Sequence, residues 1–134
     1  MKKLLILLLL SGFLIAPSVK AEIVLYCQTE LVTGFINQNG TWKTGSFNNE
    51  RYTIKFSDDY YKLSGLSKRN WDCLDAYFDK TYNTVTCTSP YQDGGSFTFN
   101  KKTNRFITIN STVFGYLDNG TDNSAISAGT CQKF

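Results

Sequence analysis

The chain has 134 residues, of which 42% are hydrophobic and 15% aromatic, and it contains no histidine. Without imidazole it cannot form a Ser-His-Asp or Cys-His nucleophile system or a histidine-ligated metal site. The formal net charge of +3 is carried by Lys2, Lys3 and Lys20, because the residues after position 21 hold equal numbers of basic and acidic side chains. A neutral domain lacks the cation surplus that phosphate binding requires, which excludes nucleic acid as the main partner.

Residues 1–21 follow the three-part pattern of a secretory signal peptide. Met1-Lys2-Lys3 is a short basic region, an apolar run extends from Leu4 to Ala16, and Val19-Lys20-Ala21 places small residues around a cleavage site. The apolar run is shorter than the roughly 20 residues that a transmembrane helix needs. We therefore expect an exported protein, periplasmic or extracellular, with a single mature domain at residues 22–134 and no membrane span in it.

The first half of the mature chain alternates apolar and polar residues with the period of a β-strand. In residues 22–27 one face collects Ile23, Leu25 and Cys27. Asn39-Gly40 is a hairpin dipeptide, since both residues accept a positive φ, and it should join residues 34–37 to residues 42–44. In residues 51–56 the core-facing positions are predicted to be those of Tyr52, Ile54 and Phe56.

Residues 67–79 do not follow this alternation. Trp71, Leu74 and Phe78 have the i, i+3, i+7 spacing of a short helix, for which Ser67 or Asn70 would be the N-cap. The segment can equally be read as an irregular loop, and a strand is the third possibility.

The remaining runs return to period two. Val85 and Cys87 share a face, as do Phe97 and Phe99. In residues 105–110 the same pattern predicts that Ile107 and Ile109 face the core, with Thr108 and Asn110 on the solvent side. Seven or eight short strands separated by turns predict an all-β fold, either a small antiparallel barrel or a sandwich, with one possible short helix near residues 67–79.

The four cysteines of the mature chain are even in number, as expected for disulfides in an oxidising compartment. Their spacing lacks the two close pairs typical of a zinc site, and no other metal site or cofactor is indicated. Of the three possible pairings we favour Cys73–Cys87, which closes a short loop, with Cys27–Cys131, which ties the first mature strand to the last.

Aromatic side chains near turns are the candidate binding residues, because exposed Tyr and Trp provide large rigid contact areas. The candidates are Trp42, Tyr60, Tyr61, Trp71 and Tyr91. Packing within a core that is poor in aliphatic residues is the alternative explanation for each of them. Tyr60 and Tyr61 are consecutive, so one of the pair should be exposed if both lie in a strand.

Three acidic residues, Asp72, Asp75 and Asp79, form the most suggestive cluster of titratable groups. Two carboxyl groups roughly 5–10 Å apart are what glycoside hydrolysis requires, although a solvated acidic face is the simpler explanation. No complete catalytic constellation is recognisable. The sequence therefore favours an exported binding module for a protein, a glycan or an envelope component, over an enzyme. A carboxylate-dependent hydrolase that uses the acidic cluster is the alternative, and a lipocalin-like carrier is a third hypothesis.

Overall fold

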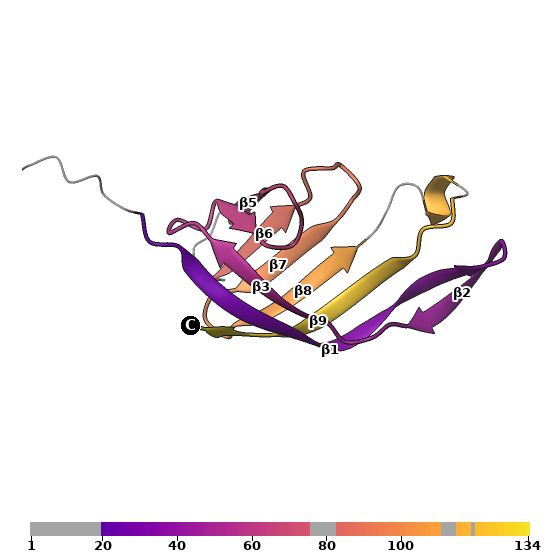
Figure 1. Cartoon of the computed structure of the whole chain (residues 1–134), viewed down its shortest axis with the longest axis horizontal. Coiled ribbons are helices and arrows are strands. Elements are labelled where there is room, and N and C mark those ends of the chain that lie inside the picture. Colours follow the sequence, from indigo (N-terminus) through magenta and orange to yellow (C-terminus); the bar gives the residue numbers. More distant parts are fainter. Residues whose placement is uncertain (1–19, 76–82, 111–114, 119) are drawn as a thin grey trace, which may run out of the picture.

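The computed structural model describes residues 20–75, 83–110, 115–118 and 120–134 (Figure 1). Its elements are nine strands and one short 3-10 turn, so the all-β prediction is confirmed. In chain order they are β1 (Ile23–Gln38), β2 (Thr41–Ser46), β3 (Arg51–Phe56), β4 (Lys62–Ser64), β5 (Trp71–Asp75), β6 (Thr84–Thr88), β7 (Ser96–Asn100), β8 (Arg105–Asn110), η3 (Tyr116–Asp118) and β9 (Ser124–Lys133).

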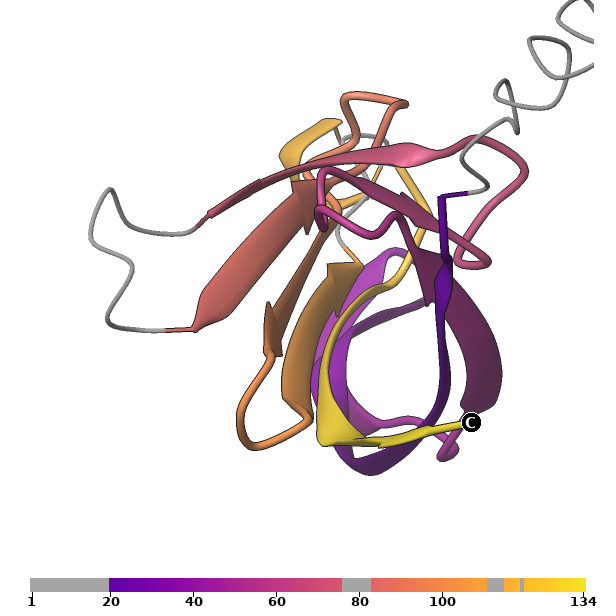
Figure 2. The same ribbon diagram turned by 90° about the vertical axis from the view of Figure 1, so that its left-hand side faces the viewer.

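The sheet is a closed antiparallel barrel of eight strands, with β2 as an additional strand. The order is β2-β1-β3-β4-β5-β6-β7-β8-β9, and pairing of β1 with β9 closes the ring. Figure 2 views the barrel end-on, with β9 beside β1 where the ring closes. Of the two predicted architectures, the barrel is therefore correct. Among the described residues no helical segment combines the length and the apolar character that crossing a membrane requires.

The long strand β1 has 16 residues and pairs with two neighbouring strands along one edge. Residues 23–28 pair with β3, and residues 33–38 pair with β2. On its other edge β1 pairs with β9, and the register shifts at a bulge between Thr29 and Leu31. As a result β1, β2 and the start of β9 extend past the other strands (Figure 1). The predicted hairpin joins β1 to β2, with φ values of 52° at Asn39 and 83° at Gly40.

One half of the barrel interior is filled by large apolar side chains. Ile54 and Phe56 are fully buried, as the alternation in residues 51–56 predicts, and Tyr52 packs against the same core. The other fully buried apolar residues include Leu25, Leu63, Val85, Phe97 and Phe99. The aromatic rings of this core contact one another, for example Phe56 and Phe99 with centroids 5.6 Å apart.

Both disulfides form as predicted, and each joins residues that lie directly opposite on neighbouring strands. Cys27 of β1 is bonded to Cys131 of β9, with Cα atoms 4.0 Å apart. Cys73 of β5 is bonded to Cys87 of β6, with Cα atoms 3.9 Å apart. All four side chains are buried. The Cys27–Cys131 bond therefore lies in the seam between β1 and β9, where the barrel closes.

Two expectations from the sequence are wrong. The described part of residues 67–79 contains no helix: residues 71–75 form strand β5, in which Trp71 and Cys73 are buried and Leu74 is 70% exposed. The two faces of β8 are also reversed. Phe106 is buried, whereas Ile107 and Ile109 lie on the outer surface. The bulky ring of Phe106 stacks on Phe97 at a centroid distance of 5.3 Å, and because side chains alternate, this contact turns both isoleucines outward.

Candidate functional site

The inward-facing side chains become smaller and more polar toward one end of the barrel. Along β8 the inner positions change from Phe106 to Thr108 and then Asn110. Along β9, read toward its N-terminal end, they change from Cys131 and Gly129, which lies against the Phe106 ring, to Ser127 and Ala125. These small residues do not fill the interior as the phenylalanines of the other half do. The end of the barrel near the start of β9 is therefore hollow.

This hollow, which we call the cup, has a volume of about 650 Å³. Its boundaries are inner faces of the barrel strands, the segment between β2 and β3, and the β4–β5 and β6–β7 loops. Its lining residues include Glu50, Arg51, Tyr52, Ser67, Trp71, Tyr91, Asp93, Thr108, Asn110, Ala125 and Ser127. The volume lies within the roughly 300–1,000 Å³ of small-molecule sites, and the mouth of a β-barrel is a common place for one.

Trp71 is held in the wall of the cup by its neighbours from two loops. Its indole Nε1 donates a hydrogen bond to Ser67 Oγ at 3.0 Å. Gly95 lies beside the ring, and a Cβ atom there would be 3.5 Å from Trp71 Cη2 and 3.2 Å from Ser89 Cβ. The β6–β7 loop therefore lies within van der Waals distance of the indole, and the tighter limit on a side chain at Gly95 comes from Ser89 of the same loop. Since only 8% of Trp71 is exposed, the residue forms a rigid part of the wall.

Tyr91 lies at the rim of the same cup and is 47% exposed. The guanidinium carbon of Arg69 is 5.4 Å from the centroid of its ring, within the range of a cation–π contact. Two of the five aromatic residues selected from the sequence, Trp71 and Tyr91, thus belong to one site.

The segment between β2 and β3 is fastened to β1 by Thr29, a buried polar residue. The backbone N–H of Glu50 donates to Thr29 Oγ1 at 2.6 Å, and the N–H of Thr29 donates to the Glu50 carbonyl at 2.9 Å. These contacts fix the start of β3, where Arg51 and Tyr52 follow. Because side chains alternate along a strand, Tyr52 packs against the core and Arg51 is exposed.

Tyr52 carries a buried hydroxyl group that finds no hydrogen-bond partner among the described residues. Its ring contacts Phe106 edge to face, with centroids 5.7 Å apart. Burial raises the pKa of Tyr52 well above its ordinary value, and the carboxylate of Glu50 raises the pKa further. The hydroxyl therefore stays protonated at physiological pH and is a neutral hydrogen-bond donor.

The other aromatic candidates lie elsewhere. Trp42, on β2, packs against Tyr116 with ring centroids 5.5 Å apart. Tyr60 and Tyr61 lie in the β3–β4 turn rather than in a strand, at the end of the barrel opposite the cup. Tyr60 packs on Phe56 at a centroid distance of 5.0 Å, and Tyr61 is 57% exposed. The five aromatic candidates therefore do not form one patch.

The acidic cluster is described only in part. Asp72 is on the outer face of β5, and its carboxylate forms an ion pair with Lys62. Both side chains are exposed to solvent. The side chain of Asp75 and the whole of Asp79 lie outside the described residues. In the part of the chain that the structure describes, no three His, Cys, Asp or Glu side chains are grouped as a metal site would need.

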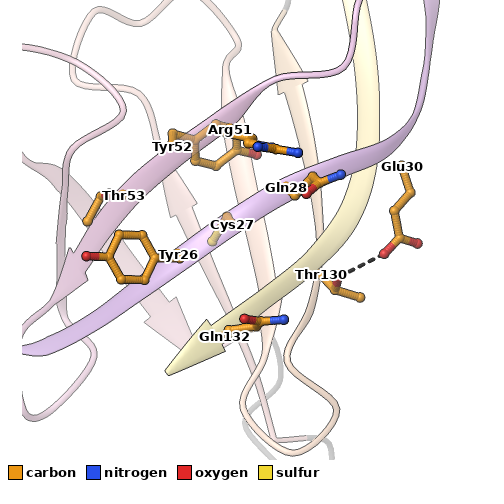
Figure 3. A pocket seen from close by; sticks show the side chains of 9 residues that line it. All are labelled: Tyr26, Cys27, Gln28, Glu30, Arg51, Tyr52, Thr53, Thr130 and Gln132. Atoms are coloured by element: carbon orange, nitrogen blue, oxygen red, sulfur yellow. Dashed lines mark hydrogen bonds between the residues drawn. The ribbon is translucent and has the colours of Figure 1, made fainter. Parts of the chain in front are cut away.

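A second depression lies on the outer surface of β3, β1 and β9 (Figure 3). Its outward-facing residues are mostly polar and include Gln28, Arg51, Thr130 and Gln132. Glu30, at the bulge of β1, accepts a hydrogen bond from Thr130 Oγ1 at 2.8 Å. All of its lining residues in the described part of the chain belong to the strands β1, β3 and β9, so no described loop encloses it, and we regard the cup as the better candidate.

An exposed apolar patch follows the outer face of β1, β9 and β8. Ala128 is paired with Leu31 on one side and Ile107 on the other, and Ile126 is paired with Ile109. Leu31 is 72% exposed, and the isoleucines are also exposed. This patch was not predicted from the sequence, because the isoleucines of β8 were assigned to the core.

Comparison of the chain with models of known protein families, with curated proteins and with solved structures finds no match. The functional interpretation therefore rests on the geometry of the chain itself.

Proposed function

We propose that the protein is an exported binding module and that its ligand occupies the cup at the mouth of the barrel. The observation that carries the proposal is the change of the barrel interior from packed phenylalanines to small and polar residues. A barrel selected only for stability would continue the apolar filling, because each unfilled position loses packing energy. Thr108, Asn110 and Ser127 instead line a hollow that is large enough for a small molecule.

Export is supported by two independent features. The first 21 residues have the pattern of a cleavable leader, and the two disulfides are of a kind that persists in oxidising compartments. We therefore place the binding function in the periplasm or outside the cell. A hydrolase based on the acidic cluster remains the alternative. Its Asp72 lies on the outside of β5, so substitution of Asp72 by Asn should leave binding in the cup unchanged.

The proposal is tested with a variant whose larger side chain fills the cup and with a control variant that carries the same substitution on the outer surface. Ala125 faces the cup from β9, between Gly34 and Asn110, and Ala128 is on the opposite face of the same strand. We expect Ala125→Leu to abolish ligand binding, because the larger side chain occupies the hollow, and Ala128→Leu to leave binding unchanged.

Binding can be measured through Trp71, because the chain has only two tryptophans and Trp42 can be replaced by Phe. The probes are a panel of neutral disaccharides, uronic acids, alkylamines and the apolar dye N-phenyl-1-naphthylamine. A change in Trp71 emission with at least one class of probe, lost in Ala125→Leu and kept in Ala128→Leu, is the expected result. A panel without any response, or equal responses in the two variants, would contradict the proposal.

A further inference from the structure

We infer that the ligand of the cup is a neutral, hydroxyl-rich molecule such as one or two sugar units. This inference rests on the proposed function and specifies its ligand. Three properties of the cup point to this class: the opposition of an aromatic wall and a polar wall, the balance of charge, and the unpartnered hydroxyl of Tyr52.

The polar and aromatic walls come from opposite sides of the barrel. In the closed order of eight strands, β5 and β9 are four strands apart in either direction, so Trp71 faces the β8–β9 side. Thr108 and Asn110 of β8 and Ser127 of β9 supply hydroxyl and amide groups there. A sugar ring has C–H faces that pack on aromatic rings and hydroxyl groups at its edge. Thr108 Oγ1 already donates to the Ser96 carbonyl at 3.1 Å, and its lone pairs can still accept a hydrogen bond. A fully apolar ligand would cover these polar groups without offering them hydrogen bonds, which is costly in a desolvated site.

The charges of the cup favour a neutral ligand. Among the described lining residues Glu50 and Asp93 are the anions and Arg51, which also faces the outer depression, is the cation, while Arg69 lies over Tyr91 at the rim. Asp93 already accepts a hydrogen bond from the backbone N–H of Gly95 at 3.0 Å. Anionic ligands are usually held by groups of arginines or lysines, and the described lining of the cup contains no such group.

Tyr52 supplies the specific polar contact. The residue lines the cup, and its hydroxyl is buried and lacks a partner among the described residues. A buried donor of this kind is satisfied when a ligand brings an acceptor. A hydroxyl or ring oxygen of a sugar is such an acceptor, and it needs no charge.

The inference is tested with the same probes in the Trp42→Phe background. We expect neutral disaccharides to change the emission of Trp71 and to be stronger ligands than the uronic acids, the alkylamines or the apolar dye. We expect Tyr52→Phe to weaken the binding of the best disaccharide about tenfold, the effect of one lost hydrogen bond. Tyr52→Phe keeps the ring that packs on Phe106, so the fold should be retained.

Tyr26→Phe is the matched control, because it removes a hydroxyl from the exposed outer face of β1. It should leave disaccharide affinity unchanged. If only the dye or a charged probe binds, and Ala125→Leu blocks it, the ligand class is wrong although the cup is a binding site. Disaccharide binding that is equally strong in Tyr52→Phe overturns the role of the hydroxyl. If none of the probes changes the emission of Trp71, both the inference and the proposed function are wrong.

Discussion

Replacement of Cys27 and Cys131 together by alanine is expected to lower the free energy of unfolding by about 4–5 kcal/mol. The disulfide joins residues separated by 104 positions, and a crosslink that closes so long a loop removes much of the conformational entropy of the unfolded chain. It also lies in the β1–β9 seam, which has the longest register of pairs in the barrel. For a domain with a typical stability of about 5–15 kcal/mol, this is a large fraction of the total.

The Cys73–Cys87 bond is the internal control, because it has the same cross-strand geometry and a separation of only 14 positions. Its replacement by two alanines should cost less, about 3 kcal/mol. Urea denaturation of both variants, followed by far-UV circular dichroism, measures the difference. A Cys73/Cys87 variant as unstable as the Cys27/Cys131 variant would show that loop length does not determine the loss.

The disulfide pairing could be favoured from the sequence because the order of strands constrains it. Cys27 belongs to the first described strand and Cys131 to the last, and these two strands meet when the barrel closes. Spacing alone leaves three pairings possible. The hairpin at Asn39-Gly40 and the inner face of β3 were also predictable, since positive φ at Asn-Gly and strict alternation are local properties.

Strand β5 could not be predicted from the sequence in the same way, because the spacing of its apolar residues fits a helix as well as a strand. The spacing of Trp71 and Leu74 fits one face of a helix, yet Leu74 is exposed and Cys73 is buried. Pairing with β6 determines the result: Cys73 faces Cys87, and the bond between them fixes an extended conformation. Tertiary pairing therefore overrides local periodicity here.

The candidate site was predicted only through its aromatic residues. Trp71 and Tyr91 could be selected from the sequence because aromatic residues near turns are typical of binding sites. Thr108, Ala125 and Ser127 line the cup from inside the barrel, but small and polar residues are normally interpreted as solvent-facing. Their inward direction depends on the register of β8 and β9, which short sequence patterns do not determine.

The second large loss of stability is expected from a substitution in β8, whose register places Phe106 in the core. Phe106→Ala is expected to lower the free energy of unfolding by about 3–5 kcal/mol, as for other buried phenylalanines. Phe106 is only 2% exposed and contacts both Phe97 and Tyr52. Ile107→Ala changes the next residue, which is 52% exposed, and should cost less than about 1 kcal/mol. Urea denaturation of the two variants provides the comparison.

The opposite order of effects would mean that Ile107 is the core residue and that Phe106 is on the surface. Because side chains alternate along a strand, Thr108 and Asn110 would then exchange faces with the isoleucines. The cup would lose Thr108 and Asn110 from its polar wall, and a hydroxyl-rich ligand would find only Ser127 there. The stability of these two variants therefore tests the fold and the candidate site together, before any ligand is known.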